Sequence, residues 1–413
     1  MRYYKTHILK NLIIRKLLKD RLIHVFNEDA SEIEPFLTSN LDNVPEQTNT
    51  IKKCIPLLLK HGYISISNSN IPSRCSLLGV KAINFELTYK CTSNCSHCLQ
   101  KNIRQTCVTQ LSTKEVKNTI LEAYLSGLCT YGINFTGGEV LGNRDDLFEI
   151  LKYTYSLKIP FRINSNSWWS RNRCLDICHV HFTSALDLVR YLKTVGLTQF
   201  AFSYDDRLYD LNMMKNLVEA IKICERTEVN YQVIFTGIDP EEIGSNLTKL
   251  RKEISSDLNY LILVSMEMVD IGGASDLKRN IYERQSNKST CENKGFYHPE
   301  FLHISPDGKV RTCMYAVGLA DVGNLSQITF TDMVNRFPYN KYSEIFANEN
   351  KRNEAFEKLV LPYLPLYKPV IHECTKNVIL AKTIESYYKN QVQNLEAIHK
   401  VIMKELNLSL ERK

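Results

Sequence analysis

The sequence predicts an α/β fold in which strands and helices alternate around a parallel sheet or a partial barrel. Three observations lead to this prediction. Between residues 82 and 269, apolar strand-like runs alternate with runs of helical apolar spacing. Polar and glycine-rich residues follow strand after strand, at the ends where parallel sheets bind ligands. Hydrophobic residues make up 44% of the chain and charged residues 23%, as in an ordinary soluble globular protein.

Length, charge and cysteine content exclude several classes of protein. A chain of 413 residues can hold two or three domains. Its net charge of +7 is spread thinly, without a basic block interleaved with aromatic residues, so we expect no nucleic-acid partner. No apolar run reaches the roughly 18 residues of a membrane span, so we expect no membrane partner. The 13 cysteines are odd in number and unevenly spaced, with no secretion signal pattern, which favours a reducing, cytoplasmic location over a disulfide framework.

The N-terminal residues 1–75 are expected to form a small domain. The first 21 residues are basic and poor in acidic residues, which favours a basic amphipathic helix over a transit peptide. The stretch "TIKKCIPLLLKHGYISI" predicts a helix that ends at Gly62 and is followed by a strand. Helix, turn and strand in this order indicate a winged-helix-like module. A Ser- and Asn-rich linker over 67–79 joins it to the next domain.

The alternating region predicts its elements one by one. Strands are expected over 82–89, 131–139, 160–167, 199–206, 230–238 and 259–269. Helices are expected over 112–128, 147–159, 185–197, 213–228 and 247–258. Ser112 and Glu115 have the spacing of a capping box at the start of the first of these helices.

The stretch "RCLDICHVH" over 173–181 has two interpretations. Its cysteines would lie one helical turn apart if the segment were helical, beside two histidines: Cys174, Cys178, His179 and His181. We interpret them as packing residues where a helix begins, with a second metal site as the alternative.

The stretch "ELTYKCTSNCSHCLQKN" over 86–102 carries the main chemical signal. Cys91, Cys95 and Cys98 have the spacing C-x3-C-x2-C and directly follow the first predicted strand. Three thiolates can hold three irons of a [4Fe–4S] cluster and leave the fourth iron open to a substrate or cosubstrate. The alternative is a three-cysteine zinc knuckle with His97 as a fourth ligand.

This cysteine loop resembles that of the radical S-adenosylmethionine (radical SAM) superfamily, over roughly residues 82–280. The resemblance implies a partial (β/α)6 parallel barrel and a [4Fe–4S] cluster on Cys91, Cys95 and Cys98. In that family, the amine and carboxylate of S-adenosyl-L-methionine chelate the open iron. Electron transfer, from a donor such as flavodoxin or ferredoxin, then produces a 5′-deoxyadenosyl radical that abstracts a hydrogen atom.

Further strand ends match cosubstrate-binding segments of the same family. The second strand ends in "TGGE", in which two glycines permit close backbone approach to a ligand and the glutamate can pair with an ammonium group. By resemblance, this segment binds the methionyl amine. The third and fourth strands end in "RINSNS" and "FSYDD", whose polar residues face cosubstrate or substrate by resemblance and are otherwise strand-end caps. The predicted cofactor-binding residues are Gly137, Gly138, Glu139, Asn164, Ser165, Asn166, Ser203 and Asp205.

A second group of cysteines lies in residues 285–375. Cys291 and Cys313 flank a predicted hairpin with a Pro-Asp-Gly turn, and Cys374 follows later. The pattern resembles the SPASM/Twitch extension, which implies an auxiliary iron–sulfur cluster on these three cysteines, with His372 as an alternative further ligand. The other interpretation is that the cluster has been lost and the cysteines only pack. Residues 376–413 are expected to form a C-terminal helix.

The resemblance implies a peptide maturase. The N-terminal module loosely resembles elements that bind the leader of a precursor peptide as an added strand. We therefore predict an enzyme that uses S-adenosyl-L-methionine to modify a leader-bearing, ribosomally synthesised peptide by crosslinking, thioether formation or epimerisation. One alternative is a radical SAM enzyme acting on a small molecule or a protein side chain. Another is a non-catalytic iron–sulfur or zinc-binding protein.

Overall fold

The fold is that of a computed structural model, which describes most of the chain. It describes every residue except 1, 6–30, 34–48, 61–63, 68–76, 78–79, 102, 105–108, 127, 130, 205–210, 238–239, 255–257, 268, 270, 272–273, 275–295, 297–298, 367–371, 407 and 409–413.

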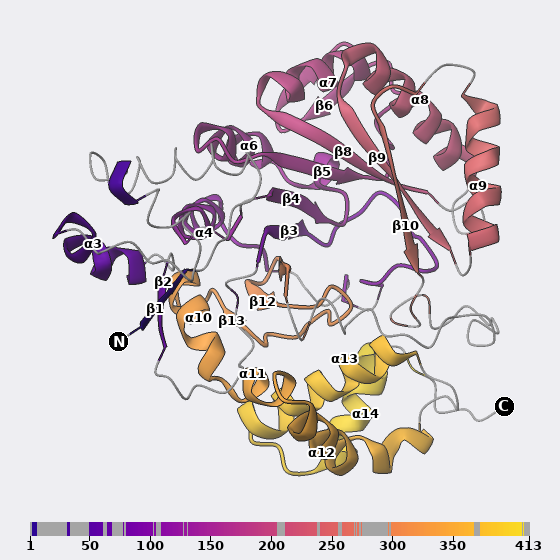
Figure 1. The fold of residues 1–413 in the computed structure, drawn as a ribbon. Coiled ribbons are helices and arrows are strands. Elements are labelled where there is room, and N and C mark those ends of the chain that lie inside the picture. Colours follow the sequence, from indigo (N-terminus) through magenta and orange to yellow (C-terminus); the bar gives the residue numbers. More distant parts are fainter. Residues whose placement is uncertain are drawn as a thin grey trace.

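The centre of the molecule is a nine-stranded, mostly parallel sheet with strand order β10-β9-β8-β5-β4-β3-β11-β12-β13 (Figure 1). Its first six strands are β3 (Ala82–Thr88), β4 (Gly132–Gly137), β5 (Phe161–Ser165), β8 (Leu197–Tyr204), β9 (Asn230–Gly237) and β10 (Leu261–Glu267). These six are parallel and lie side by side in the order of the chain. The predicted strands are confirmed, and their order is the one that right-handed βα units generate.

Helices alternate with these strands, as predicted. They are α4 (Thr113–Leu125), the short α5 (Val140–Asn143), α6 (Leu147–Ser156), α7 (Ala185–Thr194), α8 (Leu211–Thr227) and α9 (Pro240–Glu253). The predicted capping box begins α4, since the Ser112 side chain accepts from the backbone of Glu115 and the Glu115 side chain accepts from the backbone of Ser112.

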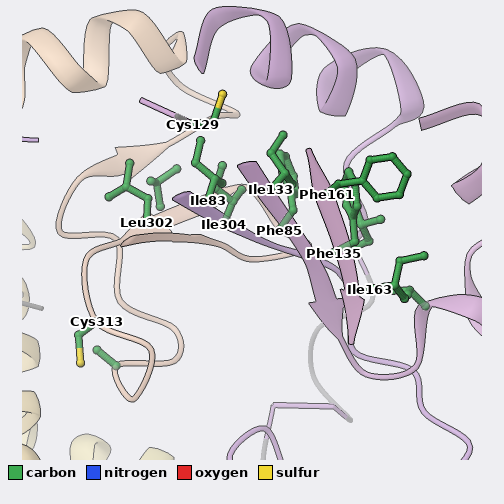
Figure 2. Close-up of a cluster of buried hydrophobic side chains, with 14 of the residues drawn as sticks. Ile83, Phe85, Cys129, Ile133, Phe135, Phe161, Ile163, Leu302, Ile304 and Cys313 are labelled. Atoms are coloured by element: carbon green, nitrogen blue, oxygen red, sulfur yellow. The ribbon is translucent and has the colours of Figure 1, made fainter. Parts of the chain in front are cut away.

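One face of the sheet carries the apolar core beneath these helices (Figure 2). Ile83, Phe85, Ile133, Phe135, Phe161 and Ile163 are all buried and point to this side. Paired registers keep them in rows, because Ile83 lies opposite Ile133 and Ile133 opposite Phe161. The residues between them in each strand therefore face the other side of the sheet.

The sheet extends past β3 into the C-terminal region. The predicted Pro-Asp-Gly hairpin is confirmed as β11 (Phe301–Ile304) and β12 (Lys309–Arg311), and the two-residue β13 (Gly323–Asn324) follows. The sequence did not reveal that β11 pairs with β3 in parallel. The hairpin thus lies directly beside the strand that leads to the three-cysteine loop.

The remaining C-terminal elements are helical and gather below this hairpin in Figure 1. They are α10 (Phe330–Arg336), η6 (Phe337–Tyr339), α11 (Lys341–Phe346), α12 (Glu349–Leu359), η7 (Leu361–Leu366), α13 (Glu373–Ile384), η8 (Glu385–Lys389) and α14 (Leu395–Leu406). The single helix expected over 376–413 is wrong. The chain leaves the helical path after η8, and Asn394 caps the next helix by accepting from the backbone of Ala397.

One expectation for a shorter segment also needs correction. The segment around Cys174 and Cys178 does not begin a helix; it forms a hairpin of β6 (Leu175–Ile177) and β7 (Val180–Phe182). Its two turn residues, Cys178 and His179, both have positive φ, as a tight two-residue turn requires.

The N-terminal region is described only in part. α3 (Asn49–Lys60) and β2 (Ile64–Ser67) confirm the predicted helix and strand. β1 (Arg2–Lys5) pairs antiparallel with β2, so these first residues are a strand and not part of an amphipathic helix. The rest of the expected N-terminal helix lies outside the described residues. In the described part of the chain, no helix is both long and apolar enough to cross a bilayer.

Candidate iron–sulfur and cosubstrate site

The three cysteines lie on an irregular loop at the carboxyl end of β3. Cys91, Cys95 and Cys98 are each partly exposed and none is in a disulfide. The backbone N–H of Cys98 donates to the carbonyl of Cys95 at 3.2 Å, so the last two cysteines belong to one turn. The backbone N–H of Ser93 donates to the Cys91 sulfur at 3.5 Å. The loop thus presents its thiols at the edge where ligands bind to parallel sheets.

Arg104 contacts this loop from the residues that follow it. Its Nη2 donates to the Cys98 sulfur at 3.0 Å and its Nη1 to the carbonyl oxygen of Ser93 at 2.9 Å. These two donated bonds hold Cys98 and Ser93 in place on the loop. The sequence did not single out this arginine, since no spacing rule links it to the cysteines.

Burial opposes ionisation of the thiols in the absence of a cation. It raises the pKa of Cys91, and it raises the pKa of Cys95 to about 12, with the neighbouring cysteines adding to this shift. The positive charge of Arg104 acts in the opposite direction on both pKa values. Bound metal deprotonates coordinating thiols, so binding of a cluster would release the protons that burial favours on these thiols.

The loop offers three free thiols as metal ligands. In the part of the chain that the structure describes, no three His, Cys, Asp or Glu side chains are placed to hold one metal ion. A mononuclear zinc site needs its ligands to converge on a single ion at about 2.0–2.3 Å. An iron–sulfur cluster instead takes one thiolate for each iron and does not require this convergence. Three thiols on one loop are a donor set that a cluster can take, and the zinc knuckle stays the alternative prediction.

Gly137 and Gly138 bring β4 against the residues that lead into the cysteine loop. Gly137 has φ +125°, and a Cβ there would lie 2.2 Å from the carbonyl oxygen of Thr88. A Cβ on Gly138 would lie 1.9 Å from the carbonyl oxygen of Lys90. The backbone N–H of Gly138 donates to Thr88 at 2.6 Å, and that of Glu139 donates to Lys90 at 2.9 Å. The close approach that we predicted toward a ligand is made here to the chain itself.

The buried side chain of Glu139 joins two segments of the chain. Its side chain is fully buried, and its carboxylate accepts from the backbone N–H of Leu141, the hydroxyl of Ser165 and the backbone N–H of Asn166, at 3.3, 3.1 and 2.8 Å. Burial raises the pKa of this carboxyl to about 7, against the lowering effect of its donors. The carboxylate therefore fixes the end of β5 to the end of β4.

Asn166 connects the end of β5 to the cysteine loop. Its amide nitrogen donates to the hydroxyl oxygens of Thr92 and Ser93, at 3.0 and 2.8 Å, and lies 3.8 Å from the Cys91 sulfur. Together with the bonds to Glu139, this places three predicted cofactor-binding segments in one connected network. Cys91, Glu139, Ser165 and Asn166 are thus brought together in space as the sequence suggested.

The remaining predicted residues take no part in these hydrogen bonds within the described part of the chain. Asn164 and Ser203 are partly exposed, on the face of the sheet opposite the apolar core. Asp205 lies outside the described residues. Cys174 is exposed, Cys178 donates its thiol to the carbonyl of Arg144 at 3.3 Å, and no metal-binding group includes them in the described part of the chain.

Two of the three predicted auxiliary ligands lie near each other. Cys313, which follows β12, and Cys374, at the start of α13, are both buried. Burial raises the pKa of Cys313 to about 12, and Cys374 adds to the shift, as expected for neighbouring thiols. His372 is buried and caps α13, accepting from the backbone N–H of Cys374 at 3.1 Å. Cys291 lies outside the described residues.

A buried ion pair joins the two cysteine-bearing regions. Arg311, at the end of β12, has no exposed side chain and donates to Glu86 of β3 and, at 3.2 Å, to the carbonyl of Cys313. The other oxygen of Glu86 accepts from the hydroxyl of Tyr89 at 2.9 Å. A buried charge needs such a partner, so this pair ties β12 firmly to the strand that precedes Cys91.

Comparisons with known proteins bear on one segment of the chain. Residues 78–172 match the family described as a 4Fe-4S single cluster domain. This segment is less than half of the chain and contains Cys91, Cys95 and Cys98. The match therefore supports a [4Fe–4S] site on the loop on grounds other than cysteine spacing alone.

Matches to whole proteins are distant. No curated protein matches the chain. Among solved structures, one described as "Native anSMEcpe with bound AdoMet" is similar over 78% of this chain and 100% of its own, with a TM-score of 0.44 and 12% sequence identity.

Proposed function

We propose that this protein is a radical SAM enzyme that modifies a ribosomally synthesised peptide. One observation carries the proposal. Three cysteines spaced C-x3-C-x2-C lie at the carboxyl end of the first of six parallel strands ordered as in the chain, inside the segment that matches a 4Fe-4S domain. This arrangement supports a cluster with one iron that has no protein ligand.

The chain's own residues would hold and orient the reacting groups. Cys91, Cys95 and Cys98 hold the cluster, and Asn166 and Arg104 fix the loop that carries them. When bound, the cluster would supply the electron that cleaves S-adenosyl-L-methionine to a 5′-deoxyadenosyl radical, which abstracts a hydrogen atom from the substrate. Gly137 and Gly138 set the backbone beside this loop, where we expect the methionyl end of the cosubstrate.

The C-terminal region supports the proposal of an auxiliary, Twitch-like cluster. Cys313 and Cys374 are neighbouring buried thiols, and Cys291 would complete the three-cysteine set. Glu86 and Arg311 link this region to the catalytic strand.

The proposal of a peptide substrate is based on the N-terminal module. β1 and β2 form a separate two-stranded sheet, to which an extended leader peptide could add as a strand. We further propose a cytoplasmic location, where thiols stay reduced, and a flavodoxin or ferredoxin as electron donor.

The test measures iron, acid-labile sulfide and nucleoside product. Anaerobically reconstituted protein should hold about eight irons if both sites bind four-iron clusters, and the Cys91→Ala, Cys95→Ala, Cys98→Ala triple variant should lose about four. The unaltered protein should release 5′-deoxyadenosine after reduction with dithionite, and the triple variant should not. Protein that binds no iron, or binds iron without forming this product, would contradict the proposal.

A second experiment addresses the substrate. A chain lacking residues 1–75 should still release 5′-deoxyadenosine but should no longer modify a leader-bearing peptide. Retained peptide modification would contradict leader capture by this module. Release of 5′-deoxyadenosine by the full chain without turnover of any peptide would favour a small-molecule substrate.

A further inference from the structure

The face of the sheet opposite the apolar core is lined with polar side chains. Parallel sheets are normally covered on both faces, and their strands are then apolar throughout. On one face the side chains are apolar, as Figure 2 shows for Ile83, Phe85, Ile133 and Phe135. The alternate positions of β3, β4 and β5 include asparagine, glutamate, threonine and arginine, and several of these are only partly buried. Polar residues at these positions need a reason other than packing.

Four of these residues form one row across four neighbouring strands, which we call the polar row: His303, Asn84, Asn134 and Arg162. His303 lies opposite Asn84, Asn84 opposite Asn134, and Asn134 opposite Arg162. The amide nitrogen of Asn134 donates to the side-chain oxygen of Asn84 at 2.7 Å. Burial, with the nearby Arg311, holds the pKa of His303 well below its usual value, so this histidine is neutral. Arg162 is therefore the positively charged residue of the polar row.

Arg162 has a neutral hydrogen-bond partner. Its Nη1 donates to the side-chain oxygen of Gln232 on β9, at 2.7 Å. Among the described residues, no carboxylate forms an ion pair with it. Burial lowers the pKa of this guanidinium, and among the described residues no acidic group offsets the shift. Partly burying an arginine without an opposite charge is costly, and a protein regains that energy when an anion binds.

Two asparagine side chains beside Arg162 on the same face carry hydrogen-bond acceptors. The side-chain oxygens of Asn134 and Asn164 are buried, and no described residue donates a hydrogen bond to them. Asn134 lies beside Arg162 on the neighbouring strand, and Asn164 is two residues further along β5, on the same face. A ligand with one carboxylate and adjacent N–H donors would satisfy all three side chains.

We propose that Arg162 binds a carboxylate of the peptide substrate, with the free side-chain oxygens of Asn134 and Asn164 accepting from the peptide's amide groups. The inference rests on the proposed function, because it assigns part of the substrate site of the same enzyme. Arg162 lies three residues before the end of β5, roughly 10 Å along the strand from the cysteine loop edge. This depth favours the substrate over the cosubstrate as the source of the carboxylate.

The test follows Arg162 directly by NMR of isotope-labelled arginine Nε–H groups in the reconstituted protein. The probe is N-acetyl-glutamate N-methylamide, and its neutral counterpart is N-acetyl-glutamine N-methylamide. The signal that is missing from the spectrum of Arg162→Lys identifies Arg162. We expect this signal to shift saturably with the glutamate probe and not with the glutamine probe. A probe that leaves the signal unmoved, or that shifts it no differently from the exposed Arg173, would overturn the proposal.

Substitutions at Arg162 test how its charge and shape contribute to binding of the glutamate probe. Arg162→Gln should weaken binding of the glutamate probe roughly 10- to 100-fold, measured by calorimetry, because a charged hydrogen bond is lost. Arg162→Lys keeps the charge but not the planar pair of donors, and should show an intermediate loss. The exposed control Arg173→Gln should bind as the unaltered protein does. Equal binding by Arg162→Gln would rule out the proposed role.

Gln232→Glu provides an independent check that does not remove the arginine. It replaces the amide oxygen beside Arg162 with a carboxylate of the same shape, and so supplies the missing anion from within the protein. We expect a higher melting temperature together with loss of glutamate-probe binding. A variant that binds the probe as well as the unaltered protein would show that the carboxylate site lies elsewhere.

A titration with the cosubstrate distinguishes the two sources of carboxylate. S-adenosyl-L-methionine alone should leave the Arg162 signal unmoved, and a saturable shift would show that the arginine binds the cosubstrate instead. Because the probe titrations require neither electron transfer nor turnover, they remain informative if the iron–sulfur chemistry fails. Failure of the probe to bind, with 5′-deoxyadenosine still released, would overturn this inference alone.

Discussion

Arg104 is the residue whose role could not be seen before the structure. It donates to the sulfur of Cys98 and, through Ser93, holds the loop that carries all three cysteines. Hydrogen bonds and positive charge near the cysteine sulfurs stabilise the reduced, more negative form of an iron–sulfur cluster. The side chain should therefore tune the reduction potential as well as shape the loop.

Replacing Arg104 tests this role. Arg104→Gln should lower the midpoint potential of the cluster by an amount on the order of tens of millivolts, measured by redox titration with spectroscopic detection. Arg104→Lys should lower it less, because it retains the charge. Arg171→Gln, at an exposed position, serves as the control. A potential that stays the same in Arg104→Gln would show that the arginine only supports the loop.

Asp321 gives a pH-dependent prediction that does not involve the cysteine loop. It is buried and accepts from the backbone N–H and the hydroxyl of Thr312. Burial raises the pKa of this carboxyl from 3.8 to about 7. The folded protein therefore retains a proton that the unfolded chain loses, and this group's contribution to stability is largest below pH 4 and declines as the pH rises to about 7.

Asp321→Asn should remove this decline. The amide can accept from the Thr312 N–H and donate to its hydroxyl oxygen, so both contacts are retained. The free energy of unfolding should then lose a pH dependence of a few kcal/mol between pH 4 and 7, measured by urea denaturation. An unchanged slope against pH would mean that the carboxyl is already ionised in the folded protein.

At the scale of elements, the contact between β4 and the loop after β3 depends on two glycines. A Cβ on Gly138 would lie 1.9 Å from a backbone carbonyl oxygen, and backbone atoms cannot move aside as a flexible side chain can. Any side chain there must therefore push apart the end of β4 and the start of the cysteine loop. This displacement should weaken cluster binding and lower the stability of the fold.

Gly138→Ala should accordingly reduce iron content after reconstitution and lower the melting temperature. Gly244→Ala is the matched control, since Gly244 is an exposed residue of α9 with no atom within 4 Å of its added Cβ. That control should bind iron normally and gain up to about 1 kcal/mol from better helix propensity. Full iron content in Gly138→Ala would show that the loop tolerates the displacement.

The elements that the sequence predicted well are those with strong local signals. Apolar alternation located the six parallel strands, and the capping box located the start of α4. The hairpin of β6 and β7 was missed, because a four-residue spacing of cysteines is compatible with a helix until the backbone shows positive φ at Cys178 and His179. Strand pairing between β11 and β3 was missed because it joins residues more than 200 positions apart.

The candidate site was predictable to a similar extent. Cys91, Cys95 and Cys98 stand out by spacing, and the strand-end motif at Gly137 to Glu139 stands out by its glycines. The contact of Asn166 with a cofactor stays a prediction, and the contact of its amide with the cysteine loop was not foreseen. Arg104, Arg162 and Gln232 carry no motif, since their importance comes from which neighbours the fold gives them. Sequence spacing identifies ligands more easily than the residues that support them.

At the scale of the whole molecule, the sheet unites regions that the sequence suggested were separate. The C-terminal hairpin is part of the same sheet as the six parallel strands, and the Glu86–Arg311 ion pair lies across the junction. A structural change near Cys313 can therefore be transmitted to β3 through the pairing of β11 with β3 and through the buried Glu86–Arg311 ion pair. In the described residues, the six parallel strands and the C-terminal hairpin therefore form one continuous sheet.

The pairing of β11 with β3 has a practical consequence for dissecting this protein. A fragment ending near residue 280 would leave the backbone N–H and C=O groups of β3 open along one side. Such an uncovered edge recruits strands from other molecules, so the fragment should aggregate instead of behaving as a minimal enzyme.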